Sequence, residues 1–349
     1  MSPYERLLVE ELRAAPHTWL VTGVGGFIGS HLLEALLLLG QKVVGVDNFT
    51  TGSPRNLEYV QESVPAEAWE RFTMHEGSIT DMGVCREVTK AVDYVLHEAA
   101  FVSVPLSLED PLGCHTTNVT GTLNLLIAAR DHRVRRVVYA SCCKAYGDDP
   151  RVPRVEAHVG RPVSPYGATK LMDEIYAGLF NDQFGLECIG LRAFNTFGAR
   201  QNPYGAFAAV VPQWLVATLR GESCRIFGDG TASRDFVPVE DVVQAYLLAA
   251  LTREVKAYGN VYNVGLGRGT SLNDLHAKLM ATLKELVPGI EPRPPVYGPV
   301  RFGAADHSWA DLSQVQLHLG YEPILSLDEG LVETARWYVK HHSPALAVQ

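Results

Sequence analysis

Residues 19–29 read Trp19-Leu20-Val21-Thr22-Gly23-Val24-Gly25-Gly26-Phe27-Ile28-Gly29, and an apolar pattern of helical spacing follows from Ser30 to Leu39. The glycines at positions 23, 26 and 29 allow a tight turn, a close approach of backbone amides to a pyrophosphate at the helix N-terminus, and close packing of helix on strand. The stretch therefore predicts a strand, a phosphate-binding turn and a helix. We expect Gly23, Gly26, Phe27, Ile28 and Gly29 to contact a dinucleotide.

An acidic residue stands where such a dinucleotide would place a ribose. Asp47 ends a second apolar run, Val43 to Val46, about 20 residues after the glycine turn. A carboxylate at that point accepts hydrogen bonds from both ribose hydroxyls and repels a 2′-phosphate. The sequence therefore favours NAD over NADP.

Short apolar runs recur between helical patterns and predict the fold class. Residues 19–22, 43–46, 94–97 and 137–140 suit strands whose apolar residues are continuous rather than alternating, as in a parallel sheet covered on both faces. We predict a doubly wound α/β domain of the Rossmann type in residues 1–195. This domain includes a surface helix at 3–15, before the first strand. Residues 196–349 are richer in proline and should form mainly a smaller α/β lobe, interleaved with the first domain.

Composition limits the partners and the compartment. The chain has 349 residues and a net charge of −9, which argues against nucleic acid or an anionic membrane as the main partner. Its most apolar early run, Leu32 to Leu39, is far shorter than the roughly 20 residues of a membrane span. The amino terminus has neither an apolar signal segment nor an Arg- and Ser-rich transit pattern. Six cysteines without a C-x-x-C spacing predict reduced thiols in a cytoplasmic protein and no metal site: Cys85, Cys114, Cys142, Cys143, Cys188 and Cys224.

Further motifs carry a family resemblance over about residues 18 to 340. The glycine turn, Asp47-Asn48-Phe49, Asn118-Val119-Thr120-Gly121-Thr122 and Tyr166-x-x-x-Lys170 together resemble the extended short-chain dehydrogenase/reductase family. A second set resembles its UDP-N-acetylhexosamine 4-epimerase branch: Arg161-Pro162-Val163-Ser164-Pro165-Tyr166, Leu191-Arg192-Ala193-Phe194-Asn195, Arg200-Gln201-Asn202-Pro203, Gly228-Asp229-Gly230 and Ser233-Arg234-Asp235-Phe236.

The resemblance implies an NAD-dependent UDP-hexose or UDP-N-acetylhexosamine 4-epimerase. Tyr166 would take a proton from a sugar hydroxyl while NAD takes the hydride, and the 4-keto sugar would receive that hydride back on its other face. Lys170 lies one helical turn further on, where it would bind the nicotinamide ribose and lower the pKa of Tyr166.

The resemblance also assigns binding roles to other positions. It implies that the remaining cofactor contacts are Asn48, Phe49, Gly52, Ser78, Ile79, Ala99, Ala100 and Asn118. The smaller lobe would bind the nucleotide sugar, with Arg234 and Arg301 on its diphosphate, since a planar guanidinium suits phosphate oxygens. Its other expected contacts are Ser103, Asn195, Gln201, Ala209, Val210 and Phe227.

Three adjacent positions depart from the family pattern. Cys142 stands where the 4-epimerases have a serine that bridges the sugar hydroxyl and the catalytic tyrosine, and a thiol is a weak donor and acceptor. In related 4,6-dehydratases Cys142, Cys143 and Lys144 would be Thr, Asp and Glu, and a family 3,5-epimerase uses a Cys and a Lys at C5. Smaller departures, which leave the sugar open, are Ser78, Val102, Ala193 and Ala304.

Two other functions therefore stay open beside the 4-epimerase. One is a nucleotide-sugar dehydratase or 5-epimerase in which Cys143 and Lys144 act at C5 or C6 of the 4-keto sugar. The other is a catalytically silent NAD- and nucleotide-sugar-binding protein, with the two cysteines as apolar fillers and Lys144 in solvent. Tyr166 and Lys170 argue against the silent protein.

Two long helical patterns bear on the oligomeric state. Residues 116–130 and 166–180 flank the expected active-site strand, and in the resembling family such helices pair into a four-helix interface. We therefore predict a homodimer.

Overall fold

The computed structural model describes residues 4, 11–13, 15–204, 208–300 and 307–342. Most of the predicted helix at residues 3–15 lies outside these ranges. So do Arg301 and Ala304.

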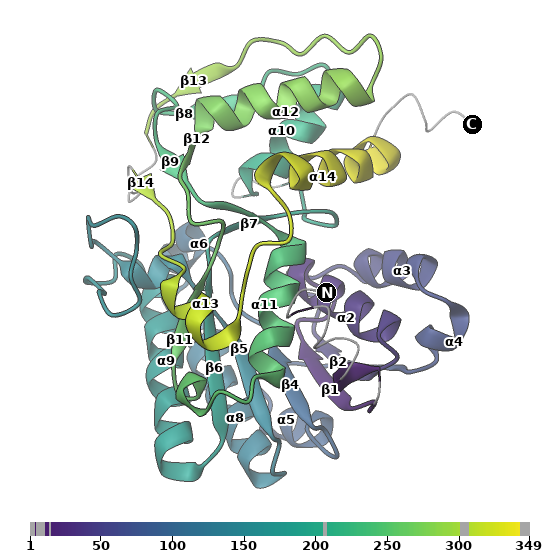
Figure 1. The fold of residues 1–349 in the computed structure, drawn as a ribbon, viewed down its shortest axis with the longest axis vertical. Coiled ribbons are helices and arrows are strands. Elements are labelled where there is room, and N and C mark those ends of the chain that lie inside the picture. Colours follow the sequence, from purple (N-terminus) through teal and green to yellow (C-terminus); the bar gives the residue numbers. More distant parts are fainter. Residues whose placement is uncertain (1–3, 5–10, 14, 205–207, 301–306, 343–349) are drawn as a thin grey trace.

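A seven-stranded parallel sheet forms the larger part of the molecule, in the order β11-β6-β5-β4-β1-β2-β3. The predicted α/β fold with a doubly wound parallel sheet is confirmed (Figure 1). The four predicted strands are β1, β2, β4 and β5. The strands are β1 (Thr18–Thr22), β2 (Lys42–Asp47), β3 (Phe72–Glu76), β4 (Tyr94–His97), β5 (Arg136–Cys142), β6 (Glu187–Ala193) and β11 (Val261–Val264).

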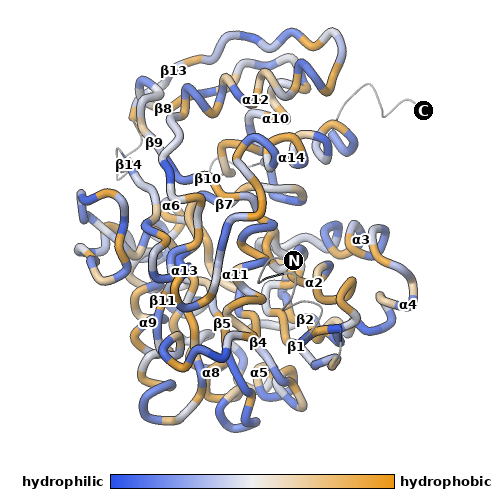
Figure 2. Tube along the Cα trace, viewed as in Figure 1, coloured by the Kyte–Doolittle hydropathy of each residue, from blue (hydrophilic) through white to orange (hydrophobic). Residues whose placement is uncertain are grey.

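Helices cover both faces of this sheet because the buried apolar residues of its strands face a core on each side. Figure 2 shows the hydropathy of the residues along these strands and helices. Trp19 and Val21 of β1 face a core built with α2 and α11, whereas Leu20 between them faces a core built with α5, α8 and α9. The helices around the sheet are α2 (Phe27–Leu38), α3 (Pro54–Ser63), α4 (Ala66–Trp69), α5 (Met82–Val88), α6 (Val104–Glu109), α7 (Pro111–His115), α8 (Gly121–Asp131), α9 (Pro165–Phe184), α11 (Val239–Leu251) and α13 (Ser313–Leu319). A π-helical segment, Thr116–Thr120, joins α7 to α8, and short 3-10 turns form at Cys143–Tyr146 and Val255–Ala257.

A smaller lobe sits above the carboxyl ends of the strands (Figure 1). Its core packs three helices against short strands and includes Trp214, Ile226, Phe236, Leu279 and Tyr338. The helices are α10 (Val210–Leu219), α12 (Leu272–Leu286) and α14 (Leu327–His342). The strands form two parallel pairs and one three-stranded sheet: β7 (Asn195–Phe197) with β10 (Phe236–Pro238), β8 (Arg225–Phe227) with β13 (Val296–Gly298), and β9 (Ser233–Arg234) between β12 (Thr270–Ser271) and β14 (His307–Ser308).

The chain passes between the two parts more than once. After β7 and α10 it returns through α11, which packs on the large sheet, and β11, which pairs with β6 at the edge of that sheet. Across the parts of the chain with described coordinates, no helix combines the length and apolarity needed to cross a membrane.

Candidate active site

A cavity of about 540 Å³ opens at the carboxyl ends of β1, β2, β4 and β5, where the large sheet meets the smaller lobe. Ligands bind at this edge in open α/β sheets. Most of the predicted site residues line the cavity: Gly23, Gly26, Phe27, Ile28, Gly29, Asp47, Asn48, Gly52, Ser78, Ile79, Ala99, Ala100, Cys142, Tyr166, Lys170, Asn195 and Gln201.

The glycine turn leaves no room for side chains. Gly23 has φ +68°, and a Cβ there would lie 2.8 Å from the amide nitrogen of Ala99. A Cβ on Gly29 would lie 2.1 Å from the carbonyl oxygen of Gly23. No side chain caps the start of α2, so its first backbone N–H groups face the cavity with the positive end of the helix dipole. This cradle fits the pyrophosphate of a dinucleotide.

Asp47 is held rigidly at the end of β2. Its carboxylate accepts hydrogen bonds from the backbone N–H of Gly25 at 2.9 Å and of Phe49 at 2.7 Å. Burial raises the pKa of Asp47, and these hydrogen bonds lower it in part. A Cβ on Gly52 would lie 2.8 Å from the Asp47 carboxylate, so a small residue is required beside it. The site therefore presents an oriented acid beside the glycine turn, as NAD binding requires.

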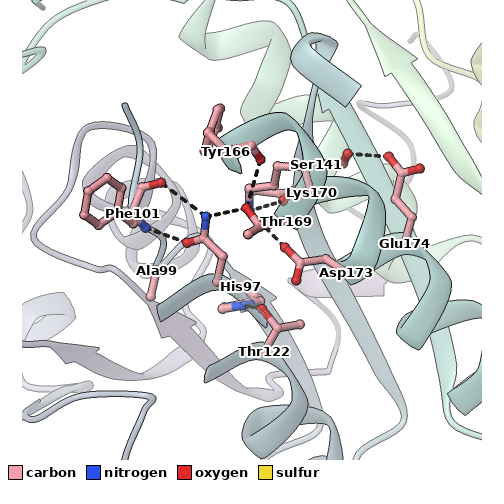
Figure 3. A network of polar contacts seen from close by, with 12 residues as sticks. His97, Ala99, Phe101, Thr122, Ser141, Tyr166, Thr169, Lys170, Asp173 and Glu174 are labelled. Atoms are coloured by element: carbon pink, nitrogen blue, oxygen red, sulfur yellow. Dashed lines mark hydrogen bonds and ion pairs between the residues drawn. The ribbon is translucent and has the colours of Figure 1, made fainter. Parts of the chain in front are cut away.

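Tyr166 and Lys170 lie in the first turns of α9. The helix begins after Ser164, whose hydroxyl caps it by accepting from the N–H of Gly167 at 3.1 Å. Lys170 Nζ donates to the carbonyl oxygen of Ala140 at 2.9 Å and lies 3.3 Å from Asp173 Oδ2 (Figure 3). Both Tyr166 and Lys170 are buried.

The lowering of the Tyr166 pKa by Lys170 stays a prediction, because other effects dominate at this residue. The pKa of Tyr166 is raised well above its ordinary value, first by burial and then by negative charge on Cys142. Lys170 is engaged by Ala140 and Asp173, and its charge is not among the strongest effects on the pKa of Tyr166.

Cys142 ends β5 and reaches the cavity beside Tyr166. Its sulfur caps the following 3-10 turn by accepting from the N–H of Lys144 at 3.5 Å. Interaction with the Cys143 thiol is the largest effect on Cys142, and with the Lys144 amide, the Lys144 charge and the Tyr166 hydroxyl it lowers the pKa of Cys142 to about 6. The lowered pKa favours the thiolate form of Cys142, which accepts hydrogen bonds from neighbouring donors more strongly than a neutral thiol does.

Cys143 and Lys144 do not line this cavity. Cys143 packs against the aromatic rings of Tyr146 and Phe194. Its pKa is raised well above the ordinary value by its interaction with Cys142 and by burial, so its thiol stays protonated.

The segment that carries these residues is anchored on both sides. Ser141 donates a hydrogen bond to Glu174 of α9, and Glu174 binds Arg192 of β6 through two hydrogen bonds of 2.8 and 2.7 Å. Tyr146 donates to Asn263 of β11 at 2.6 Å, and its ring lies under the Arg192 guanidinium. Figure 3 shows Ser141 and Glu174 side by side, away from Tyr166.

Several predicted contacts lie outside the cavity wall. Asn118 is fully buried and holds the chain after β4 against α9: it accepts from the N–H of Phe101 at 2.7 Å and donates to Thr169 at 2.9 Å. Ser103 caps α6. The other predicted residues that do not line the cavity are Phe49, Ala209, Val210, Phe227 and Arg234. Arg234 belongs to β9 of the smaller lobe, and its charge lowers the pKa of Cys143.

Sequence reasoning missed two ionisable residues of the cavity, Glu98 and Tyr246. Glu98 directly follows β4, and Tyr246 comes from the middle of α11. An acid placed immediately after a buried parallel strand was the available signal for Glu98. Tyr246 stands in an apolar helical pattern, and no sequence signal indicates that it lines the cavity. Among the residues with described coordinates, no group of His, Cys, Asp and Glu is arranged to hold a metal ion.

Known proteins share this architecture over nearly the whole chain. UDP-glucose 4-epimerase of Mycolicibacterium smegmatis is 35% identical over 323 residues, which cover 91% of this chain and 97% of that protein. The solved UDP-N-acetylglucosamine 4-epimerase of Methanobrevibacter ruminantium, in complex with UDP-N-acetylmuramic acid, is 34% identical with a TM-score of 0.84, covering 93% of this chain and 99% of its own. The UDP-glucose 4-epimerase of Thermus thermophilus, solved with NAD, is 31% identical with a TM-score of 0.79 and the same coverage.

The family model agrees with these relatives. The model of the NAD-dependent epimerase/dehydratase family matches residues 19–265, from β1 to just beyond β11. With the glycine cradle, Asp47 and the Tyr166–Lys170 pair on one cavity, this match identifies the chain as a member of the NAD-dependent epimerase/dehydratase family.

Proposed function

We propose that this protein is an NAD-dependent UDP-sugar 4-epimerase that inverts a hexose or N-acetylhexosamine at C4 through a transient 4-keto sugar. The observation that carries the proposal is the placement of Tyr166 and Cys142 in the same cavity as the glycine cradle and Asp47. A hydride acceptor held by the cradle and a proton acceptor beside it can then act on one carbinol group. The relatives named as UDP-glucose and UDP-N-acetylglucosamine 4-epimerases support this substrate class.

The chain supplies the proton acceptor for the oxidation at C4. NAD, when bound, supplies the hydride acceptor and returns the hydride to the opposite face. Tyr166 takes the proton of the sugar hydroxyl, and its own phenolic proton passes to the Cys142 thiolate. This path needs no tyrosinate before the substrate arrives, because the low pKa of Cys142 provides the base and the pKa of Tyr166 stays high. The proton returns by the same path when C4 is reduced.

Lys170 acts as a fixed cation that orients the cofactor at this end of the cavity. Its ammonium group is fixed by Ala140 and Asp173 and leaves one donor for a ribose hydroxyl. The smaller lobe supplies the nucleotide side, with Arg234 near Cys143 and with Asn195 and Gln201 in the cavity wall. The family resemblance implies further sugar-nucleotide contacts from Ala209, Val210, Phe227 and Arg301, and from Ser103 at the start of α6.

The placement of Cys143 argues against elimination or 5-epimerisation. A base at C5 needs a titratable group in the cavity, whereas Cys143 is packed against aromatic rings with a raised pKa. Lys144 also lies outside the cavity wall.

Deuterium incorporation separates the possible reactions. The protein would be incubated with UDP-N-acetylglucosamine and with UDP-glucose in heavy water, and the sugars followed by NMR. We expect the galacto isomer without ring deuterium, because the hydride never leaves the cofactor. Deuterium at C5 or C6 would contradict the proposal in favour of a dehydratase or 5-epimerase. Bound nucleotide sugar without any turnover would point to a silent binding protein.

We also propose that the protein is a homodimer through α8 and α9. Met172, Ile175 and Leu179 form an exposed apolar stripe along α9, at the spacing of one helix face. Leu112 of α7, a helix that contacts α9, is 74% exposed as well. Such a contiguous apolar surface marks a protein contact.

The proposed compartment is the cytoplasm. All six cysteines are free thiols, and a thiolate at Cys142 is useful only where it stays reduced. Fractionation of cells that produce the protein tests this, and recovery outside the cytoplasm would contradict it.

A further inference from the structure

The cavity contains an acid that the proposed reaction does not use. The backbone N–H of Glu98 donates to Thr22 of β1, both to its carbonyl oxygen and to its hydroxyl, each at 3.2 Å. The side chain lines the cavity together with Tyr166 and Lys170. Glu98 is thus fixed at the base of the site by β1.

The Glu98 carboxyl lies in a buried setting with an open hydrogen-bonding position. Its Oε1 is buried and has no hydrogen-bond partner within the described coordinates. The Tyr246 hydroxyl lies beside the carboxyl and lowers its pKa as a hydrogen-bond donor, while the described geometry leaves Oε1 itself without a hydrogen bond. A buried acceptor without a donor costs free energy unless a bound ligand supplies the donor.

Glu98 and Cys142 are the two described cavity groups at this end whose charge can change near neutral pH, and the Glu98 carboxyl is the one with a buried oxygen that lacks a partner. The titratable groups of the described cavity wall are Asp47, Glu98, Cys142, Tyr166, Lys170 and Tyr246. The two tyrosines stay neutral because burial raises the pKa of each. His97, next to Glu98 in β4, is neutral because burial and Lys170 lower its pKa to about 3. Asp47 ends β2, with β1 between it and β4.

Glu98 is poised to change its protonation near neutral pH. Burial raises the pKa of its carboxyl to about 7, with Tyr246 and Lys170 acting in the opposite direction. An additional positive charge nearby lowers that pKa and draws the proton off. The oxidised nicotinamide ring is cationic and the reduced ring is neutral, so the two forms of the cofactor differ in this respect.

We propose that Glu98 is a cofactor-binding residue that accepts a hydrogen bond from the dinucleotide through Oε1 and, when ionised, favours oxidised over reduced nicotinamide. This inference rests on the proposed function, because it places the nicotinamide at the Tyr166 end of the cavity. Ionisation of Glu98 holds the resting cofactor oxidised, ready to accept a hydride. Tyr246 is a positioning residue that orients the carboxyl.

The test compares oxidised with reduced cofactor on the holoenzyme. Wild type, Glu98→Gln and Tyr246→Phe are dialysed against a fixed mixture of NAD⁺ and NADH at about pH 6 and about pH 8, and the bound dinucleotides are then released and assayed. We expect the bound ratio of wild type to shift about tenfold toward NAD⁺ at the higher pH, the effect of one pKa unit. Glu98→Gln should remove most of this shift, because only Cys142 still ionises at this end of the described cavity, and Tyr246→Phe should reduce it.

A second readout and a control keep the inference open to failure. Binding of NAD⁺ at about pH 6 should release more protons from wild type than from Glu98→Gln, measured by calorimetry in buffers of different ionisation enthalpy. Asp241→Asn is the matched control: Asp241 is a buried acid of α11 whose pKa burial also raises to about 7, and it lies outside the cavity wall. We expect it to bind the two forms of the cofactor as wild type does.

The outcomes separate this inference from the proposed function. Equal pH shifts in wild type and Glu98→Gln, with sugar turnover intact, would overturn the role of Glu98 alone. Loss of the shift in Glu98→Gln without any UDP-sugar epimerisation by wild type would overturn the proposed function and support the role of Glu98.

Discussion

Cys142 is the residue at which this site differs most from a serine-based proton path. A serine hydroxyl stays neutral at working pH and can only relay a proton. An ionised Cys142 thiol can itself accept the proton as a base. Its low pKa has a local origin in the donors around it, Cys143, the Lys144 amide and Tyr166. Charge and hydrogen bonding therefore make up for the weak bonding of sulfur.

Substituting Cys142 should separate the relay role from the base role. Cys142→Ala should lower kcat about 100-fold, the usual range for losing a proton-transfer group. Wild-type kcat should fall as pH drops through about 6, because the thiolate becomes protonated there. Cys142→Ser should keep measurable activity but lose this acidic limb, as pH–rate profiles would show. An unchanged limb in the serine variant would contradict the thiolate role.

Tyr166 should be required for chemistry but not for binding. Tyr166→Phe removes the group that contacts the sugar hydroxyl, and we expect kcat to fall at least about 100-fold. Its NAD content should match wild type, because the glycine cradle and Asp47 are untouched. Turnover assays and cofactor release measure the two effects, and substantial activity in the phenylalanine variant would require another proton acceptor.

At the scale of elements, the junction of β1 and α2 depends on a glycine inside the helix. Gly29→Ala would place a methyl group against the Gly23 carbonyl, which belongs to backbone and cannot move cheaply. We expect a loss of about 1–3 kcal/mol in the free energy of unfolding, together with weaker NAD binding. Urea unfolding and cofactor titration provide the measurements.

A second helical glycine offers the matched control. A Cβ on Gly178 of α9 would meet only the Gly259 carbonyl at 3.9 Å, an ordinary contact. Gly178→Ala should therefore be neutral or stabilise by up to about 1 kcal/mol through helix propensity. Equal losses in both variants would show that the Gly29 contact is not the cause.

The sequence predicted elements best where local pattern and packing agree. The β1 turn and α2 were predicted closely because three glycines and an apolar run point to the same geometry; the helix begins at Phe27 rather than Ser30. The short strands of the smaller lobe, such as β9 at Ser233–Arg234, carry no periodicity of their own and form through pairing with distant segments. The Glu98–Tyr246 encounter likewise depends on α11 returning to the large sheet, which local patterns do not reveal.

At the scale of the whole molecule, buried acids and buried histidines change the stability of the protein in opposite directions as pH rises. Burial raises the pKa of Asp241 to about 7 and of Asp235 to about 6, so their contribution to stability falls as pH rises through this range. Burial lowers the pKa of His97 to about 3, and its contribution falls as pH drops below the unfolded value of about 6.5. The pH dependence of wild-type stability is therefore a difference between opposing contributions, and a single group is measured by comparing wild type with a variant that lacks it.

Asp241→Asn should reveal how much the Asp241 carboxyl contributes to the pH dependence of the free energy of unfolding. The asparagine can still accept from the N–H of Ile324, so the tie between α11 and the segment before α14 is kept. Because the wild-type acid loses stability as pH rises from about 4 to about 7, the variant should gain on wild type by up to about 1.4 kcal/mol per pH unit. Urea unfolding across this range measures the difference, and a constant gap would contradict the raised pKa.

The proposed dimer can be tested on its apolar stripe. Ile175 is 63% exposed on α9, and Ile175→Glu would place a charge in the interface, so we expect dissociation into monomers at micromolar concentration. Leu317→Glu on α13, where Leu317 is 72% exposed and away from the stripe, should leave the dimer intact. Light scattering measures both variants, and a monomeric wild type would refute the proposed dimer.

The anchors at Ser141 and Tyr146 have a consequence for how this enzyme could diversify. Between them stand the three positions that depart from the family pattern, while the bonds that hold the segment run to Glu174 and Asn263 behind it. Exchanges at positions 142–144 can therefore alter the reagents presented to a sugar without loosening the scaffold that presents them. Single substitutions at these positions during evolution can therefore change the reaction without affecting the folding of the protein.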